Sequence, residues 1–273
     1  PTKRLAYGTM GLMFVNFSVG GVLTNFAAPP ALTLSRCWGW TVTAFFSLFG
    51  WRVLAGIAIV NVLYFFFFRR DFCKLKPMKH KEEVVVESDK HKGPVPVWIT
   101  VVHLAFLAWT VITAHYLPIF LGSYLLFLGF HQATRTHQYN LNLKRPMMVG
   151  LFLAGLVIHG GFQGWWIERL IGDLGFGAML LAGTVLTAFN ENTTVAYLAC
   201  LLDDLKPSIQ YALVSGLVAG GGLTIIAHAP NPAGQALLRP YFKKGISSWD
   251  LFLAALVPTL IFMAIFYFFP TAP

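Results

Sequence analysis

Long runs of apolar residues alternate with short polar stretches along nearly the whole chain of 273 residues. They lie at about 5–34, 52–68, 97–114, 116–133, 147–166, 170–202, 209–238 and 249–269. Several approach the roughly 20 residues that a helix needs to cross about 30 Å of hydrocarbon. Of all residues, 56% are hydrophobic and only 11% are charged, which is more apolar surface than a soluble fold hides. The pattern predicts an all-α, polytopic membrane protein.

Helix-breaking residues interrupt two of these runs. Residues 20–34 read GGVLTNFAAPPALTL, and residues 220–238 read GGGLTIIAHAPNPAGQALL. A shift of 200 positions aligns them, and the identical pairs are Gly20 and Gly220, Gly21 and Gly221, Leu23 and Leu223, Thr24 and Thr224, Ala27 and Ala227, and Pro30 and Pro230. A break inside a membrane is tolerated where it is buried in protein or lines a wet cavity. One copy alone would favour a simple kink, whereas two matched copies favour a binding site.

The basic residues predict the orientation of the spans. The net charge of +9 comes mostly from Lys and Arg in the loops, so it does not indicate a nucleic-acid partner. The hydrophilic stretch 69–94 is rich in both residues, and the positive-inside rule places it in the cytoplasm. From that anchor, 5–34 runs outward and 209–238 runs inward. Repeats of opposite direction with interrupted helices are typical of secondary transporters.

This symmetry predicts a domain organisation. Residues 1–68 form the end of a first inverted repeat, with the broken helix at 5–34 and a span at 52–68. A cytoplasmic linker covers 69–96. The second repeat covers 97–273, with a scaffold at 97–166, a hairpin at 170–202, a broken helix at 209–238 and a last span at 249–269. Because little precedes the first broken helix, we expect the chain to be the C-terminal part of a larger transporter.

The segment 170–202 contains the densest polar cluster of any apolar run, FNENTT at 189–194. It predicts a re-entrant hairpin, two half-spans meeting at a polar tip. The candidate ion ligands are Asn190, Glu191, Asn192, Thr193 and Thr194 at the tip, Gly221, Thr224, His228 and Asn231 in the second broken helix, and Asn16, Thr24 and Asn25 in the first, where Ser18 is a further polar neighbour. A carboxylate at membrane depth is costly and usually functional, so Glu191 could exchange H⁺ for Na⁺. The alternative is that Glu191 faces outer water or pairs with a basic residue. His228 either relays protons or is a structural hydrogen-bonding residue.

The cysteines and short motifs exclude other chemistries. Cys37, Cys73 and Cys200 are isolated, and their odd number and spacing predict neither a metal site nor a disulfide framework. No P-loop, HExxH or GxSxG motif is present, so the sequence indicates neither ATP-driven transport nor an enzyme. We expect no cofactor other than the transported ions.

The two motifs TAFNENTTVAYL and AGGGLTIIAHAPNPAG, about 25 residues apart, resemble the second half of the ion transporter superfamily, of the arsenite permease and sodium/proton antiporter type. Its members pair a hairpin like SAFxDNxP with a broken helix like GGNxTLIGxxANxV. The matching residues here are Ala188, Phe189 and Asn192 in the first motif, and Gly220, Gly221, Leu223, Thr224, Ile226, Ala229 and Asn231 in the second. The chain differs from these family patterns in two places: its hairpin tip reads NEN, and its broken helix contains His228. The resemblance is greatest to bacterial Na⁺/H⁺ antiporters and implies a homodimer of elevator-type protomers.

Three functions remain open on the sequence. The first is a Na⁺/H⁺ antiporter that lies in the inner membrane in contact with lipids. The carboxylate of Glu191 favours this function. The second is an anion permease or symporter of the same superfamily, in which the same polar tips would hold an oxyanion. The third is a membrane scaffold without transport, which would pack both broken helices with no polar cavity between them.

Overall fold

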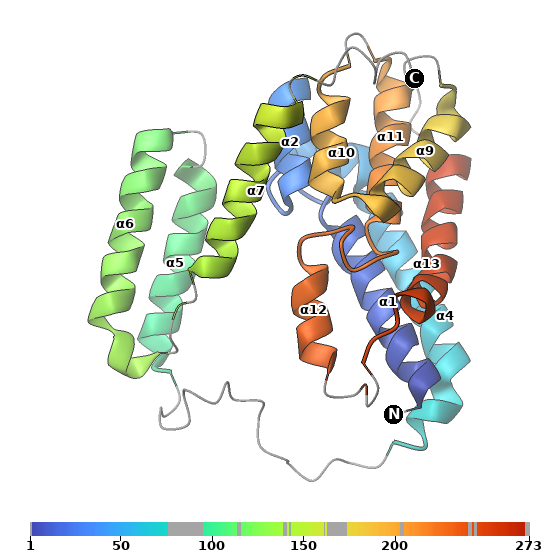
Figure 1. Cartoon of the computed structure of the whole chain (residues 1–273), viewed down its shortest axis with the longest axis horizontal. Coiled ribbons are helices and arrows are strands. Elements are labelled where there is room, and N and C mark those ends of the chain that lie inside the picture. The colour runs from blue at the N-terminus through green and yellow to red at the C-terminus, as the bar shows by residue number, and fades with distance from the viewer. Residues whose placement is uncertain are drawn as a thin grey trace. The chain divides into compact units, whose positions relative to one another are not determined.

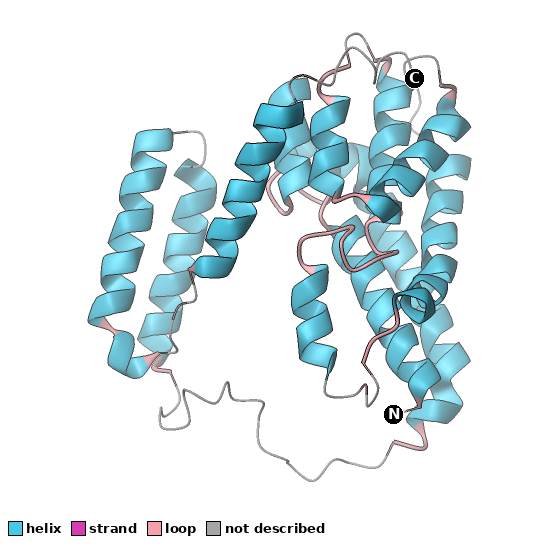
Figure 2. Ribbon diagram, viewed as in Figure 1, coloured by secondary structure: helices cyan, strands magenta, loops and turns pink. Residues whose placement is uncertain are grey.

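The structure is a computed structural model, and it describes residues 2–75, 95–113, 116–138, 141, 143–160, 162, 174–202, 205–239, 242 and 245–270. Within these ranges every regular element is a helix (Figure 2). The expected all-α fold is therefore confirmed. Most of the predicted linker, at 76–94, and the start of the predicted hairpin, at 170–173, lie outside the described residues.

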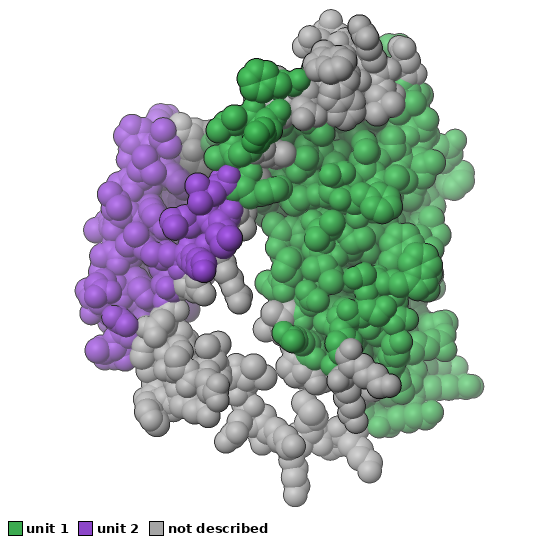
Figure 3. Space-filling view, viewed as in Figure 1, with its two compact units in different colours: residues 1–75, 152–273 green, residues 76–151 purple. Residues whose placement is uncertain are grey.

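The chain divides into two compact units, residues 76–151 and residues 1–75 with 152–273 (Figure 3). In the smaller unit, α5 (Val97–Thr113) packs beside α6 (Leu117–Ala133), and a short 3₁₀ turn (Arg135–His137) follows. α7 (Lys144–Gly160) begins in the smaller unit. The predicted domain boundaries at 68, 96 and 97 stay predictions.

The larger unit contains the two interrupted segments and the hairpin (Figure 1). Its elements are α1 (Lys3–Gly20), α2 (Pro29–Trp38), α3 (Val42–Phe45), a π-helical turn (Phe46–Gly50), α4 (Trp51–Phe72), α9 (Phe176–Phe189), α10 (Asn192–Ala199), α11 (Pro207–Gly220), α12 (Asn231–Leu238) and α13 (Ser248–Phe268). Two helical stretches among the described residues, Val42–Phe72 and Ser248–Phe268, are long and apolar enough to cross a membrane.

The two glycine-rich segments are non-helical in the same way. α1 ends at Gly20 and α11 at Gly220, and the following glycines have nearly equal backbone angles, φ −62° and ψ −17° at Gly21 against φ −64° and ψ −13° at Gly221. The N–H of Leu23 donates to the carbonyl of Gly20 at 3.2 Å, and the N–H of Leu223 donates to that of Gly220 at 3.0 Å. Proline then occupies the first turn of both α2 and α12, where its missing N–H is tolerated.

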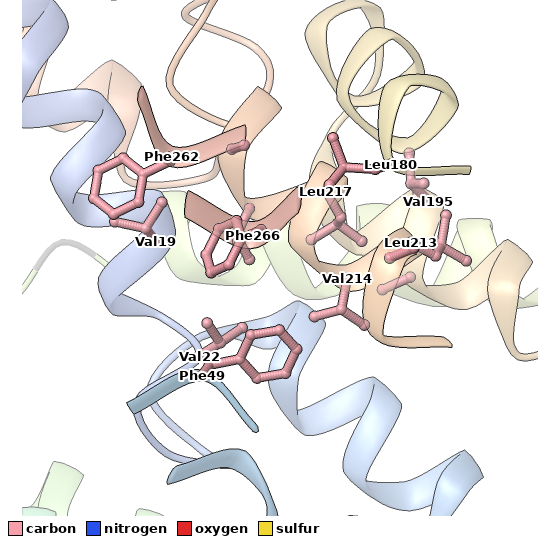
Figure 4. Close-up of a cluster of buried hydrophobic side chains, with 14 of the residues drawn as sticks. Val19, Val22, Phe49, Leu180, Val195, Leu213, Val214, Leu217, Phe262 and Phe266 are labelled. Carbon is pink, nitrogen blue, oxygen red and sulfur yellow. The ribbon is translucent and has the colours of Figure 1, made fainter. Parts of the chain in front are cut away.

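α11 lies at the centre of the core of the larger unit. Its residues from Tyr211 to Gly220 are all buried, and side chains from α1, α9, α10 and α13 gather around it (Figure 4). Glycines allow its backbone to approach α9 closely: a Cβ on Gly216 would lie 2.1 Å from the carbonyl oxygen of Leu180. Small residues serve the same purpose between helices in membranes generally. The core therefore holds α11 rigidly up to the point where its helix stops.

Arg52 is buried at 6% exposure, at the end of α4 away from the basic linker. Its guanidinium donates to the carbonyls of Phe269 at 2.5 Å, Pro270 at 2.9 Å and Leu48 at 2.7 Å. It also lies over the ring of Tyr211. Arg52 thus satisfies carbonyls at the C-terminal end of α13, where a positive charge is favourable.

One sequence-based expectation was wrong. Cys37, at the end of α2, and Cys200, at the end of α10, form a disulfide across 163 residues of chain, and Cys73 is free. The spacing of three isolated cysteines carries no sign of this pairing. It arises because α2 packs against α10 in the folded protein and brings their ends together.

Candidate functional site

α9 and α10 form the two halves of a hairpin whose tip is Asn190 and Glu191. α9 ends at Phe189, and Asn190 has an extended backbone with φ −127° and ψ 162°. Glu191 is the N-cap of α10, which begins at Asn192. The free N–H groups of the first turn of α10 therefore face the tip.

The Glu191 carboxylate binds these N–H groups. Its Oε2 accepts from the backbone N–H of Thr193 at 2.7 Å and of Thr194 at 3.2 Å, and its Oε1 accepts from the Thr193 hydroxyl at 2.8 Å. A negative charge is favourable at a helix N-terminus. Within the described residues Glu191 forms no ion pair, and its charge is balanced by helix donors.

Two hydrogen bonds join the hairpin tip to the second break, which is residues 221–230. The N–H of Asn192 donates to the carbonyl of Ala227 at 2.9 Å. In return, the hydroxyl of Thr224 donates to the carbonyl of Ala188 at 2.9 Å. These two bonds join segments more than 30 residues apart in sequence, and they hold the ends of α9 and α10 against the interrupted helix.

Asn231 satisfies the backbone that the second break exposes. Its fully buried side chain donates from Nδ2 to the carbonyls of Gly221 and Thr224, both at 2.8 Å. Carbonyls freed in apolar surroundings need such partners. One amide therefore closes the loop between α11 and α12.

α1 reaches the same place from the other side. The Ser18 hydroxyl donates to the carbonyl of Val218 at 2.7 Å. A Cβ on Gly221 would lie 2.1 Å from Ser18 Oγ and 3.3 Å from Asn192 Nδ2. The end of α1, the hairpin tip and the second break thus converge on Gly221, where a Cβ would displace the Ser18 side chain.

Several buried polar atoms of α1, the first break, the hairpin and the second break have no hydrogen-bond partner among the described residues. They are both amide atoms of Asn192, Oδ1 of Asn231, both ring nitrogens of His228, Oγ1 of Thr24, Oδ1 of Asn16 and Oγ1 of Thr187. Buried polar groups in proteins are nearly always bonded, so the unpartnered amide atoms of Asn192 and Asn231, both beside Gly221, point to a ligand or to water. Amide and hydroxyl oxygens are the donors that hard cations prefer. These groups fit a small cation.

The predicted site residues fall into four groups. Contacts join Glu191, Asn192, Thr193, Gly221, Thr224 and Asn231 into one cluster, and Thr194 contributes its backbone N–H. His228 is buried within the second break, at 2% exposure. Asn190 is exposed and donates to the carbonyl of Leu186 in its own helix at 3.1 Å. Among the described contacts, none joins Asn16, Thr24 or Asn25 to the hairpin.

Two residues of this region were not predicted as ligands. Ser18 was noted only as a polar neighbour, although its position 200 residues before Val218 matches the offset of the repeat. Thr187 is fully buried with an unpartnered hydroxyl one turn before the tip. The signal for Thr187 was its three-residue spacing from Asn190, which places it near the end of α9.

A family model described as "Putative Na+/H+ antiporter" matches residues 1–269, nearly the whole chain. No curated protein and no solved structure matches the chain.

Proposed function

Because the chain belongs to the family described as "Putative Na+/H+ antiporter", we propose that it is a secondary transporter exchanging Na⁺, or another monovalent cation, for H⁺. The family and the long apolar helices make it a membrane protein. We further propose the inner membrane as its location, an inverted-repeat architecture, and a homodimer as its assembly.

The observation that carries the proposal is the pair of orphaned amides of Asn192 and Asn231 beside Gly221. Asn192 and Asn231 offer neutral oxygens there, and Glu191, bonded to the residue that follows Asn192, offers the negative charge. Neutral amide oxygens beside one carboxylate suit a monovalent cation. The carboxylate offsets the charge of the cation, and the amide oxygens replace the water that hydrates it.

The same carboxylate offers a route to proton exchange. A proton on Glu191 removes the charge that attracts the cation, so H⁺ and Na⁺ compete for one group. Protonation also weakens an N-cap that depends on charge, because charge-assisted hydrogen bonds are about twice as strong as neutral ones. The shape of the tip is thereby coupled to the ion it holds.

The hydrogen bonds at the start of α10 disfavour the anion alternative. An oxyanion at a half-helix N-terminus would use the free N–H groups of the first turn. In α10, Glu191 already occupies the N–H groups of Thr193 and Thr194. The carboxylate would also repel the anion.

The scaffold alternative predicts breaks that pack without polar cavities. The unpartnered atoms of Asn192, Asn231 and His228 argue against it, because a scaffold gains nothing from burying them.

The disulfide supports the orientation drawn from the charges. Disulfides persist in oxidising compartments and are rare in the cytosol. Cys37 and Cys200 lie at the ends of α2 and α10 that the positive-inside rule assigns to the outer side. Two independent properties, charge and cysteine oxidation, thus favour the same orientation in the inner membrane.

The test uses the full-length gene product in everted vesicles. A respiration-driven pH gradient is followed with a ΔpH dye while NaCl, LiCl or KCl is added. Dissipation by a cation in the wild type, absent in Glu191→Gln, is the expected result. No response to any of the three, with the protein present in the membrane, would refute cation/proton exchange and turn attention to anion uptake.

A further inference from the structure

We propose that the larger unit binds an anionic phospholipid in a groove between α1, α4 and α13, remote from the hairpin tip. The groove has a volume of about 770 Å³, and its walls include Tyr7, Leu12, Val60, Tyr64, Val257 and Ile261. No step of cation exchange proposed above involves these residues.

The groove is polar at one end and apolar over the rest of its length. Lys3, Arg4 and Asp250 line one end. From there its wall runs along α1 as far as Leu12 and along α13 as far as Ile261. Farther along the wall, the polar atoms are already paired: the Tyr7 hydroxyl accepts from the N–H of Ser247 at 2.7 Å, and the Tyr64 hydroxyl bonds to that of Thr9 at 2.5 Å. A ligand that fills the groove is amphipathic, with its polar group at the end next to Lys3.

The length of the groove matches one membrane leaflet. Leu12 lies nine positions after Lys3 in α1, and Ile261 lies eleven positions after Asp250 in α13. At 1.5 Å per residue these spans are about 14 Å and about 16 Å. One leaflet contributes about 15 Å, half of the hydrocarbon thickness. An acyl chain entering beside Lys3 would therefore end near the deepest wall.

The polar end carries excess positive charge. Lys3 forms an ion pair with Asp250 at 2.7 Å, and its side chain is 70% exposed, so two of its three donors remain available. Arg4 has no carboxylate partner among the described residues. Arg69 and Arg70 lie in the last turn of α4, next to Asp71. The Asp71 carboxylate accepts a hydrogen bond from the Thr2 hydroxyl, so this end of α4 lies beside the start of α1. In the groove itself, Lys3 and Arg4 face the single carboxylate of Asp250, and this excess of positive charge favours a phosphate-bearing headgroup.

Arg4 is held in a position suited to that headgroup. Its guanidinium lies over the ring of Phe67, 4.3 Å from the centroid, and near the ring of Phe68 at 5.9 Å. Stacking leaves the edge N–H groups of the guanidinium free, and their planar fork matches a phosphate. The rings that position Arg4 also line the groove, so headgroup and chain sites are continuous.

The test is native mass spectrometry of the full-length protein from nanodiscs of equal phosphatidylglycerol and phosphatidylcholine. We expect at least about fivefold preference for phosphatidylglycerol in the wild type, a factor equivalent to about 1 kcal/mol. Arg4→Gln should reduce the preference toward parity. Val257→Trp, which places a large ring in the groove from a position 63% exposed, should reduce the number of retained lipids.

Two matched variants serve as controls. Arg36→Gln removes an exposed arginine of α2 outside the groove, and Val62→Trp adds the same ring at a position of α4 that does not line it. Both should behave as wild type. Equal binding of the two lipids by wild type, or an unchanged preference in Arg4→Gln, would overturn the proposal. So would displacement of the bound lipid by millimolar inorganic phosphate, because the headgroup alone would then account for binding.

Discussion

The hydroxyl of Ser18 donates to the backbone carbonyl of Val218 at 2.7 Å, across 200 residues of sequence. This separation equals the offset that aligns the two interrupted segments. In repeats related by a two-fold axis, equivalent positions come together only close to that axis. In the proposed inverted-repeat architecture, the axis would therefore pass between α1 and α11, next to the point where both helices stop.

A side chain at Gly221 should displace Ser18. Gly221→Ala would place a methyl group 2.1 Å from Ser18 Oγ and 3.0 Å from its Cβ, so the hydroxyl must turn away and lose its bond to the Val218 carbonyl. We expect loss of cation-dependent proton movement and a decrease in thermal stability. Gly20→Ala is the matched control, since nothing lies within 4 Å of a Cβ there. Equal activity of the two variants in vesicles would show that the close approach is not needed.

Asn231→Ala should destabilise the protein because it leaves the carbonyls of Gly221 and Thr224 without their donor. Each unsatisfied buried group costs about 1–3 kcal/mol. We expect a lower melting temperature in detergent and loss of transport. Asn190→Ala, which removes only an exposed bond within α9, should change stability by less than about 0.5 kcal/mol. A wild-type melting temperature for Asn231→Ala would contradict this role of the amide.

The disulfide predicts a defined count of reactive thiols. In denatured, unreduced protein, peptide mapping should find a maleimide label on Cys73 but not on Cys37 or Cys200, whereas reduced protein should carry the label on all three. Replacing Cys37 and Cys200 by serine should lower the melting temperature by roughly 5–10 °C, from a typical disulfide contribution of 2–4 kcal/mol. Three reactive thiols without reductant would show that the bond does not form in the cell.

Arg52→Leu should be strongly destabilising. It removes donors from the carbonyls of Leu48, Phe269 and Pro270, and hydrogen bonds to a charged group contribute about 1.5–3 kcal/mol each. Arg52→Lys should recover part of the loss, because one ammonium group cannot reach all three carbonyls in the guanidinium geometry. Arg36→Leu, at an exposed arginine, should leave the melting temperature unchanged. A similar decrease for Arg36→Leu would show that the effect is not specific to the buried position.

The sequence was sufficient to predict where helices stop and where polar groups concentrate. Glycine and proline act on their own backbone, so the breaks after Gly20 and Gly220 follow from local chemistry. The hairpin tip at 190–191 was visible for the same reason, as polar residues inside an apolar run.

Contacts between distant segments could not be predicted in this way. Cys37 meets Cys200 only because α2 packs on α10, and Thr224 reaches Ala188 only because the second break lies against the end of α9. Neither pairing has a sequence spacing that marks it. The role of Glu191 as an N-cap was likewise hidden, since it depends on α10 beginning directly after it.

The most direct test measures ion exchange by the purified full-length protein in liposomes. An imposed outward proton gradient should drive uptake of radioactive Na⁺, and an imposed Na⁺ gradient should drive proton movement in the opposite direction. Glu191→Asp should retain part of both fluxes, because aspartate keeps the charge and caps helices well. Glu191→Gln should lose both. Gradient-driven Na⁺ uptake that persists in Glu191→Gln would contradict the assignment of this carboxylate to cation and proton exchange.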